Sequence, residues 1–295
     1  MSTSTETRTI VIDNGSSSCK AGFAGEQLPA SICKSFVGQD TKTNEIYISN
    51  DAQLKADTLT IRYPIENGII TNWEDIEKIW NYAFHQLKAD PSSHRVLLTD
   101  TAMNTKENRQ KMIEILFEKF NVPSAYIAKR GVLALYAAGL LTGVVLESGD
   151  SISMATPVSN GYYINDTAIL TTAAGSAVTT ALQNMLNNRG YDLKAHSQLD
   201  IIREIKEKHC LVSTNYAADV NGQENLFDYS LPNGTAIKIG HEVIKSSEVL
   251  FRPQEQGLEA KGIHEILSES IAKCDKTIQQ KLYSNIVVAG GTSKL

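Results

Sequence analysis

The sequence predicts an α/β protein built from two related α/β domains. Short β-branched runs alternate with amphipathic helical segments, which is typical of α/β architecture. A strand–turn–strand pattern at residues 11–25 recurs at residues 143–164, and a late apolar strand runs into a double glycine at residues 285–291. The repetition predicts one domain at residues 1–138 and a second at residues 139–295.

In the first half, the β-rich run Arg8–Ile12 leads through a serine-rich turn into a second strand, Lys20–Phe23. Gln39–Glu45 has no periodicity and is predicted to be a loop. Trp73–Leu87 carries its large apolar residues at helical spacing, which predicts an amphipathic helix. The remaining predicted elements are strand Arg95–Leu98, helix Thr105–Phe120, strand Ala125–Ala128 and helix Gly131–Ala138.

In the second half, the repeated hairpin is followed by a further turn at Asn160–Gly161, an Asn-Gly pair typical of tight hairpins. Helices are predicted at Val178–Asn188 and Leu199–Cys210, and a hairpin at Leu231–Ile239. Ile263–Leu282 is expected to form one long helix or two short ones. The run Asn285–Gly291 is a predicted buried strand that ends in the double glycine.

Composition excludes several classes of function. The formal net charge of -5 argues against broad attraction to nucleic acids or anionic membranes. No segment has the apolar length of a membrane span, and the polar N-terminus does not resemble a secretory signal, so we expect a cytoplasmic protein without a membrane or nucleic-acid partner. The 4 cysteines have no paired spacing, which predicts packed thiols rather than a zinc site or a disulfide framework.

Three turns carry the chemistry that the sequence suggests: Asp13–Ser18, Glu147–Ser151 and Gly290–Ser293. Each combines glycine, which lets a phosphate approach the main chain, with small hydroxyl side chains. The first two also place a carboxylate at the end of a strand, as a Mg²⁺ nucleotide site requires. Each turn alone could be a simple hairpin, but their duplication favours two loops that hold a nucleotide.

At the level of longer segments the chain resembles actin. The matching stretches are DNGSSSCKAGFAGE, RYPIENGIITNWEDIEKIWNYAF, RVLLTDTAMNTKENRQKMIEILFEKFNVP, GYDLKAHSQLDIIREIKEKHC and YSNIVVAGGTSKL, in actin's order. The resemblance implies the actin-like ATPase fold, with two related α/β domains around a cleft that binds ATP or ADP with Mg²⁺ or Ca²⁺. It also implies a cytoskeletal role in the cytoplasm, and actin or actin-binding proteins as partners.

The resemblance also implies roles for individual residues. Ser16 and Lys20 would contact phosphate, Asp150 would contact the ribose, and Asp13 and Glu147 would approach the metal through water. The full set implied to bind nucleotide is Asp13, Gly15, Ser16, Lys20, Gly149, Asp150, Arg203, Lys206, Glu207, Gly290, Gly291 and Thr292. From the residues alone, Arg203, Lys206 and Glu207 could equally form a solvated, salt-bridged helix face.

Three departures from actin predict weak or absent hydrolysis. Arg130 stands where actin has the glutamine that orients the attacking water, and an arginine cannot accept a hydrogen bond from water. Met154 replaces a histidine on the same side of the site. Glu147 replaces an aspartate near the metal, and its extra methylene changes the reach of the carboxylate. Arg130 could instead offset phosphate charge and strengthen ATP binding.

Other departures concern assembly. The predicted insertion at about residues 36–66 has a shortened loop, and Glu255 and Gln256 stand where actin is apolar, in a second insertion at about residues 176–260. Burying charge at a subunit interface is costly, so we expect weak self-polymerisation. The last part of the actin fold, which returns to the first domain, is expected to be missing. Two alternatives remain: a conventional ATP-hydrolysing filament subunit, and a non-binding structural remnant or pseudogene product.

Overall fold

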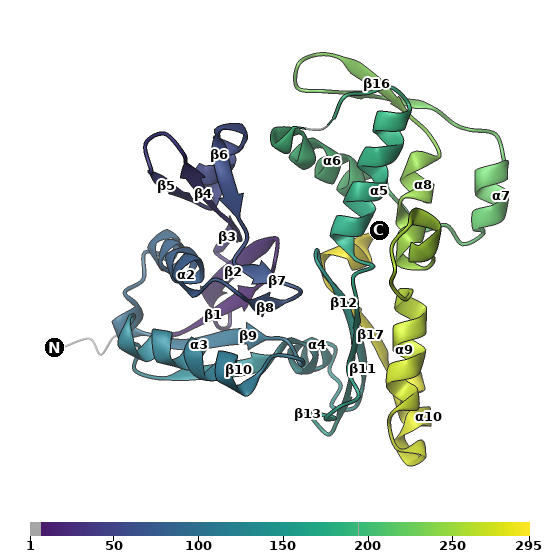
Figure 1. Cartoon of the computed structure of the whole chain (residues 1–295). Helices are drawn as coiled ribbons and strands as arrows, with labels where there is room; N and C mark the ends of the chain where they lie inside the picture. Colours follow the sequence, from purple (N-terminus) through teal and green to yellow (C-terminus); the bar gives the residue numbers. More distant parts are fainter. Residues whose placement is uncertain (1–6, 194) are drawn as a thin grey trace. The chain divides into compact units, whose positions relative to one another are not determined.

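The computed structural model describes residues 7–193 and 195–295 and divides the chain into two compact units. Unit 1 comprises residues up to Leu141 together with Val158–Tyr163, and unit 2 comprises Thr142–Pro157 and Ile164–Leu295. Each unit contains its own sheet and helices (Figure 1). The mixture of sheets and helices confirms the predicted α/β class.

The main sheet of unit 1 has the strand order β10-β9-β1-β2-β3. β1 and β2 form an antiparallel hairpin, β9 lies parallel to β1, and β10 lies parallel to β9. The strands are β1 (Thr9–Asn14), β2 (Ser18–Phe23), β3 (Ser31–Lys34), β9 (Arg95–Asp100) and β10 (Ala125–Lys129). β1, β2, β9 and β10 confirm the predicted strands of the first half.

Helix α2 spans Trp73–Leu87, as the apolar periodicity predicts, and packs against β2 and β3. Its buried face carries Ile76, Ile79, Trp80 and Phe84, which lie in the main core of unit 1 with α3 residues such as Leu116. α3 (Lys106–Glu118) begins after Thr105, whose hydroxyl accepts a hydrogen bond from the Asn108 amide. α4 (Arg130–Ala137) follows β10 directly.

A smaller three-stranded sheet, β5-β4-β6, occupies the segment between β3 and α2. The prediction of a loop over Gln39–Glu45 was wrong at its start, because Gln39 and Asp40 pair in β4. The backbone hydrogen bonds of this strand outweigh its weak hydrophobic pattern. The elements are β4 (Val37–Asp40), β5 (Ile46–Ile48), α1 (Asn50–Gln53), η1 (Ala56–Thr58), β6 (Leu59–Arg62), β7 (Ile65–Glu66) and β8 (Ile69–Ile70).

The main sheet of unit 2 has the order β13-β12-β11-β17 and repeats the plan of the first. β11 and β12 are neighbours joined by a short turn, and β17 lies parallel to β11 as β9 does to β1. The strands are β11 (Gly143–Ser148), β12 (Ser153–Ser159), β13 (Tyr162–Tyr163), β14 (Ile169–Thr171) and β17 (Ile286–Ala289). β13 and the last residues of β12 group with unit 1.

The helices of unit 2 follow the predicted order, with shifted ends. The region Ile263–Leu282 forms two helices rather than one, because Asp275 caps the second through the Thr277 amide. The predicted hairpin at Leu231–Ile239 begins earlier, at Phe227. The elements are α5 (Gly175–Asn188), α6 (His196–His209), α7 (Tyr216–Asn221), β15 (Phe227–Ser230), β16 (Ala236–Ile239), α8 (Glu242–Lys245), α9 (Ile263–Ala272) and α10 (Lys276–Ser284).

Candidate functional site

A chain of hydrogen bonds connects the core of unit 1 to the residues beside the turn between β1 and β2. The Trp80 indole N–H donates to Asn14 Oδ1 at 2.8 Å, and the backbone N–H of Asn14 donates to Thr99 Oγ1 at 3.1 Å. The Thr99 hydroxyl in turn donates to Asp13 Oδ1 at 2.7 Å. This chain fixes the position of the Asp13 carboxylate, and Lys20 Nζ lies 4.0 Å from its second oxygen.

The turn leaves no space for a side chain at position 15, so glycine is required there. A Cβ added to Gly15 would lie 2.6 Å from the Ser18 carbonyl oxygen, well inside van der Waals contact. Ser16 is half-buried and Lys20 is exposed. Asp13 of β1 and Lys20 of β2 are register partners beside this turn, and Ser16 lies in the turn itself. A carboxylate, an ammonium and a hydroxyl group are therefore found at the same end of the hairpin.

Arg130 lines a small cavity of about 10 Å³ in unit 1, together with Asn14 at the end of β1. A cavity of this size holds about one water molecule. Its polar lining comprises Asn14, Thr99, Asp100, Thr101, Asn104 and Arg130. Arg130, which is predicted to impair the positioning of water, therefore lines the same cavity as Asn14 and as Thr99, whose hydroxyl bonds the Asp13 carboxylate.

Asp100 is the charged centre of the wall beside this cavity. Its carboxylate accepts hydrogen bonds from Arg109 Nε at 2.6 Å, Asn104 Nδ2 at 2.7 Å and Lys129 Nζ at 3.0 Å. Burial lowers the pKa of Lys129, while the Asp100 charge acts in the opposite direction. The ion pairs hold the end of β10, where α4 and Arg130 begin.

The sequence places Asn14 in the first candidate turn, but it does not identify Thr99 or Trp80 as parts of the site. Thr99 and Asp100 directly follow the predicted strand Arg95–Leu98. Two polar residues at the end of a strand are the only feature of the sequence that could have indicated a role for Thr99 in the site. Trp80 lies in the core cluster, as a large apolar residue on the buried face of an amphipathic helix does, and its hydrogen bond is a tertiary feature.

In unit 2, the turn after β11 is tied to two other segments. The Gly149 carbonyl accepts hydrogen bonds from the Thr292 hydroxyl at 2.7 Å and from the Gly175 amide at 3.0 Å. The Asp150 carbonyl accepts from the Ser176 amide at 2.7 Å. The second and third predicted turns are therefore in direct contact, beside the start of α5.

Close approach at this junction requires glycine at two further positions. A Cβ added to Gly175 would lie 2.6 Å from Thr292 Oγ1, and one added to Gly290 would overlap the Ser148 carbonyl oxygen. Gly290 also has φ 97° and ψ 164°, a conformation that is essentially restricted to glycine. Gly291 has nothing within 4 Å of an added Cβ.

Lys206 on α6 points toward the same junction. Its ammonium donates to the Gly175 carbonyl and to the Thr179 hydroxyl, both at 3.1 Å, and the residue is buried. Burial lowers the pKa of Lys206, partly offset by the charge of Asp150. Lys206 therefore supports the start of α5 as well as lying beside the second turn.

The other two predicted residues of α6 have different surroundings. Arg203 is half-buried and forms an ion pair with Asp200 at 3.1 Å, whereas Glu207 is exposed. Glu147 is half-buried on β11, opposite Ala289 of β17. Met154 is buried on β12, opposite Leu170 of β14.

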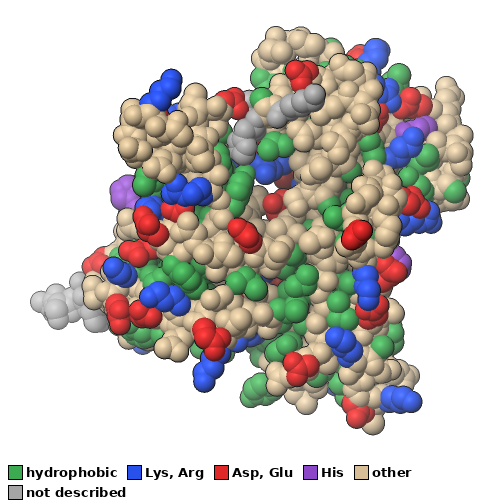
Figure 2. All heavy atoms as spheres, viewed as in Figure 1, with side chains coloured by type: hydrophobic (Ala, Val, Ile, Leu, Met, Phe, Trp, Pro, Cys, Tyr) green, Lys and Arg blue, Asp and Glu red, His purple; other side chains and the backbone are tan. Residues whose placement is uncertain are grey.

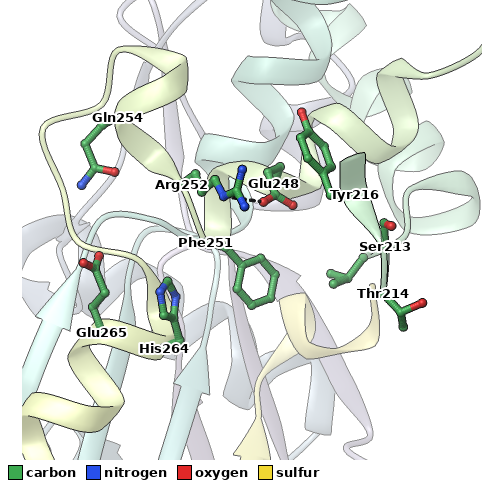
Figure 3. A pocket seen from close by; sticks show the side chains of 10 residues that line it. Ser213, Thr214, Tyr216, Glu248, Phe251, Arg252, Gln254, His264 and Glu265 are labelled. Carbon is green, nitrogen blue, oxygen red and sulfur yellow. Dashed lines mark ion pairs between the residues drawn. The ribbon is translucent and has the colours of Figure 1, made fainter. Parts of the chain in front are cut away.

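A larger cavity in unit 2, of about 530 Å³, contains none of the predicted nucleotide residues. Figure 3 shows Arg252 directed at Glu248, and the ion pair measures 3.3 Å. His264 lies against the Phe251 ring, and the Glu265 carboxylate accepts from the Gly262 amide at 2.7 Å. Burial raises the pKa of Glu248. Within this lining, Arg252 and Glu248 are thus paired with each other, and the Glu265 carboxylate is bonded to backbone.

The surface has no single sign of charge on the face shown in Figure 2, where lysine and arginine alternate with aspartate and glutamate. Among residues 7–193 and 195–295, no helix combines the length and the apolar composition that a membrane span requires. All 4 cysteines are buried free thiols, as predicted.

Comparison with known protein families is consistent with this geometry. The family model described as Actin matches residues 4–295, which is nearly the whole chain. The match agrees with the two α/β sheets of one plan and with the predicted resemblance. On these grounds the chain belongs to the actin family.

Proposed function

We propose that this chain is a cytoskeletal actin-family protein that binds ATP or ADP together with Mg²⁺ or Ca²⁺. The observation that carries the proposal is the repeated hairpin with its parallel neighbouring strand, β1–β2 with β9 and β11–β12 with β17. In both repeats the turn contains a glycine with little room for a side chain. Such turns present backbone amides to phosphate.

The residues present fit the proposed ligands. Beside the first turn, Thr99 holds the Asp13 carboxylate and Lys20 lies next to it, so a carboxylate and an ammonium would be available to a cation and to phosphate groups. Asp13 and Glu147 would bind the metal through water, and Lys20 and Ser16 would contact phosphate oxygens. A bound Mg²⁺ would neutralise phosphate charge.

We propose that hydrolysis is weak. Arg130 lines the water-sized cavity beside Thr99 and Asn14. A guanidinium has only donors, so it cannot accept the hydrogen bond by which a glutamine orients an attacking water. Met154 is apolar and buried, and its thioether is a much weaker hydrogen-bond acceptor than the histidine that stands at this position in actin.

Binding is tested by thermal unfolding with and without Mg-ATP. Ligand at 100 times its dissociation constant adds about 2.7 kcal/mol of stability, so a clear rise in Tm is expected. Lys20→Met removes the ammonium of the first turn and should reduce the rise. Lys42→Met, which removes the same charge from an exposed turn, serves as the control. No rise in the unmodified protein would favour the non-binding alternative.

Hydrolysis is tested separately by single-turnover release of phosphate. We expect slow release from the unmodified protein and faster release from Arg130→Gln, which restores a hydrogen-bond acceptor. Release at the rate of ordinary actin by the unmodified protein would show that it is a competent ATPase.

A further inference from the structure

Two cysteines of unit 1 face each other across neighbouring strands. Cys19 of β2 and Cys33 of β3 are register partners, each is 1% exposed, and both lie in the main core cluster. The Ser35 amide donates to the Ser17 carbonyl at 3.0 Å, two positions further along the same ladder. Because bonded pairs alternate in antiparallel ladders, Cys19 and Cys33 occupy a hydrogen-bonded pair.

The distance expected between the Cα atoms of Cys19 and Cys33 lies in the range found in disulfides. The Cα atoms of a hydrogen-bonded antiparallel pair lie about 5.5 Å apart, within the range of about 4.4–6.8 Å found in disulfides. Cys33 Sγ already reaches across to the other strand, where it donates to the Cys19 carbonyl at 3.4 Å. β3 is the last strand of its sheet, pairs with β2 and also packs against α2.

The two thiols differ in acidity. Hydrogen bonding between them lowers the pKa of Cys33 and raises that of Cys19, whose pKa burial raises further. The Ser49 hydroxyl also lowers the pKa of Cys33. Since the thiolate is the reactive form, Cys33 is the attacking sulfur.

We propose that Cys19 and Cys33 are a redox site that forms an intramolecular disulfide on exposure to a hydroperoxide. The Cys33 thiolate attacks one peroxide oxygen and the O–O bond breaks, which gives a Cys33 sulfenic acid. The other peroxide oxygen leaves with the Cys33 proton, as an alcohol from an alkyl hydroperoxide or as water from hydrogen peroxide. Cys19 sulfur then attacks Cys33 sulfur, and the S–O bond breaks. The departing hydroxide leaves as water with the Cys19 proton, so two electrons pass from the thiols to the peroxide.

The other two cysteines provide an internal comparison. Cys210 lies 3.4 Å from the Ser246 hydroxyl, and burial raises its pKa to about 11. Cys274 donates to the Ser270 carbonyl at 3.5 Å, and burial raises its pKa as well. The hydrogen bonds of Cys210 and Cys274 are with serine and not with another cysteine. Neither therefore has a facing thiol with which to close an intramolecular disulfide, and we expect both to stay reduced under the same treatment.

The test treats the folded protein with hydrogen peroxide, alkylates the remaining thiols after unfolding, and maps the peptides by mass. The expected product lacks two hydrogens, joins the peptides that contain Cys19 and Cys33, and is reversed by a dithiol. Cys210 and Cys274 should be alkylated in full. Alkylation of all four cysteines, over-oxidation of Cys33 with Cys19 alkylated, or a disulfide between molecules would each overturn the proposal.

Variants give a second readout that does not depend on nucleotide binding. Closing the chain between β2 and β3 should raise the Tm of the peroxide-treated protein over that of the reduced protein, because a disulfide restricts the unfolded chain. Cys33→Ser should abolish that rise, whereas Cys274→Ser, also at a buried thiol, should retain it. The same rise in Cys33→Ser would contradict the assignment, and peptide mapping of the unmodified protein decides the matter if Cys33→Ser does not fold.

Discussion

At the scale of single residues, glycine and threonine determine how closely the segments of the candidate site approach. Thr99 holds Asp13 in unit 1, and Thr292 holds the Gly149 carbonyl in unit 2. Each hydroxyl donates one hydrogen bond to the turn that it supports. The two units therefore use the same chemistry at corresponding places.

The double glycine allows a matched prediction. Gly290→Ala should lower the unfolding free energy by about 3 kcal/mol, since its φ and ψ lie in a glycine-only region and its Cβ would overlap the Ser148 carbonyl. Gly291→Ala, whose Cβ meets nothing within 4 Å, should change stability by less than about 0.5 kcal/mol. Urea unfolding of both variants measures the difference, and equal effects would refute this account.

A second residue-scale prediction concerns the ion pair of Arg62 with Asp75, at 2.8 Å. Burial raises the pKa of Asp75, but hydrogen bonds from Arg62 and Lys78 outweigh burial and leave it below its ordinary value. A depressed folded pKa stabilises the protein above the unfolded pKa of about 3.9, and this stabilisation is lost as pH falls through the folded pKa.

Arg62→Leu should therefore cost about 2 kcal/mol at neutral pH, less than the cost of breaking a fully buried pair, and the cost should shrink below about pH 4. The control is Arg8→Leu, because Arg8 and its partner Glu26 are 50% and 41% exposed. Exposed pairs contribute about 0–1 kcal/mol. Denaturant unfolding across pH measures both, and a cost at Arg62 that does not vary with pH would argue against the pair.

At the scale of elements, α2 is the helix that joins the core of unit 1 to its candidate site. Ile79 is fully buried in the core cluster, while Trp80 contributes both its ring to that cluster and its indole N–H to Asn14. The helix begins after Asn72, whose side chain accepts from the Asp75 amide at 3.0 Å. A single element thus fixes packing and turn geometry together.

The buried face of α2 predicts a large effect of truncation. Ile79→Ala should lower the unfolding free energy by about 3 kcal/mol, because removing buried methyl groups loses transfer free energy and leaves a cavity. Asn81→Ala on the exposed face of the same helix should change stability by less than about 0.5 kcal/mol. Thermal unfolding compares them, and a small loss at Ile79 would mean that the core adjusts around the smaller side chain.

At the scale of the whole molecule, the proposed assembly behaviour depends on the short turn between β4 and β5. Asp40 Oδ1 accepts from the Lys42 amide at 2.8 Å and from the Thr43 amide at 3.2 Å, and Asn44 adopts φ 59°. The turn is compact and polar. Entering a subunit interface would desolvate these polar groups, which is costly without matching partners.

We therefore expect the protein to stay in the supernatant when it is sedimented at low micromolar concentration in polymerising salt with Mg-ATP. Ordinary actin treated in parallel should pellet and serves as the positive control. Pelleting of this chain by itself would favour a conventional filament subunit, and pelleting only in mixtures with actin would indicate co-assembly.

Much of the fold could be predicted from local patterns. The apolar spacing of Trp73–Leu87 predicts α2 with its observed ends, and Asn160–Gly161 predicts a turn in which both residues have positive φ. The end of β4 could not be predicted, because Gln39 and Asp40 are strand residues only through pairing with β5 and β6. Patterns within a segment report its own periodicity and not its distant partners.

The sequence by itself determined the α/β class, the repeated hairpins, the residues of the three turns and the resemblance to actin, since each of these depends on residue type and local spacing. Only the tertiary structure decided that Thr292 contacts Gly149, that Trp80 supports Asn14, and that Cys19 faces Cys33. The physical reason is that residues 14 positions or more apart meet only when strand pairing, as for Cys19 and Cys33, or the packing of a helix or turn, as for Trp80 and Thr292, brings them together.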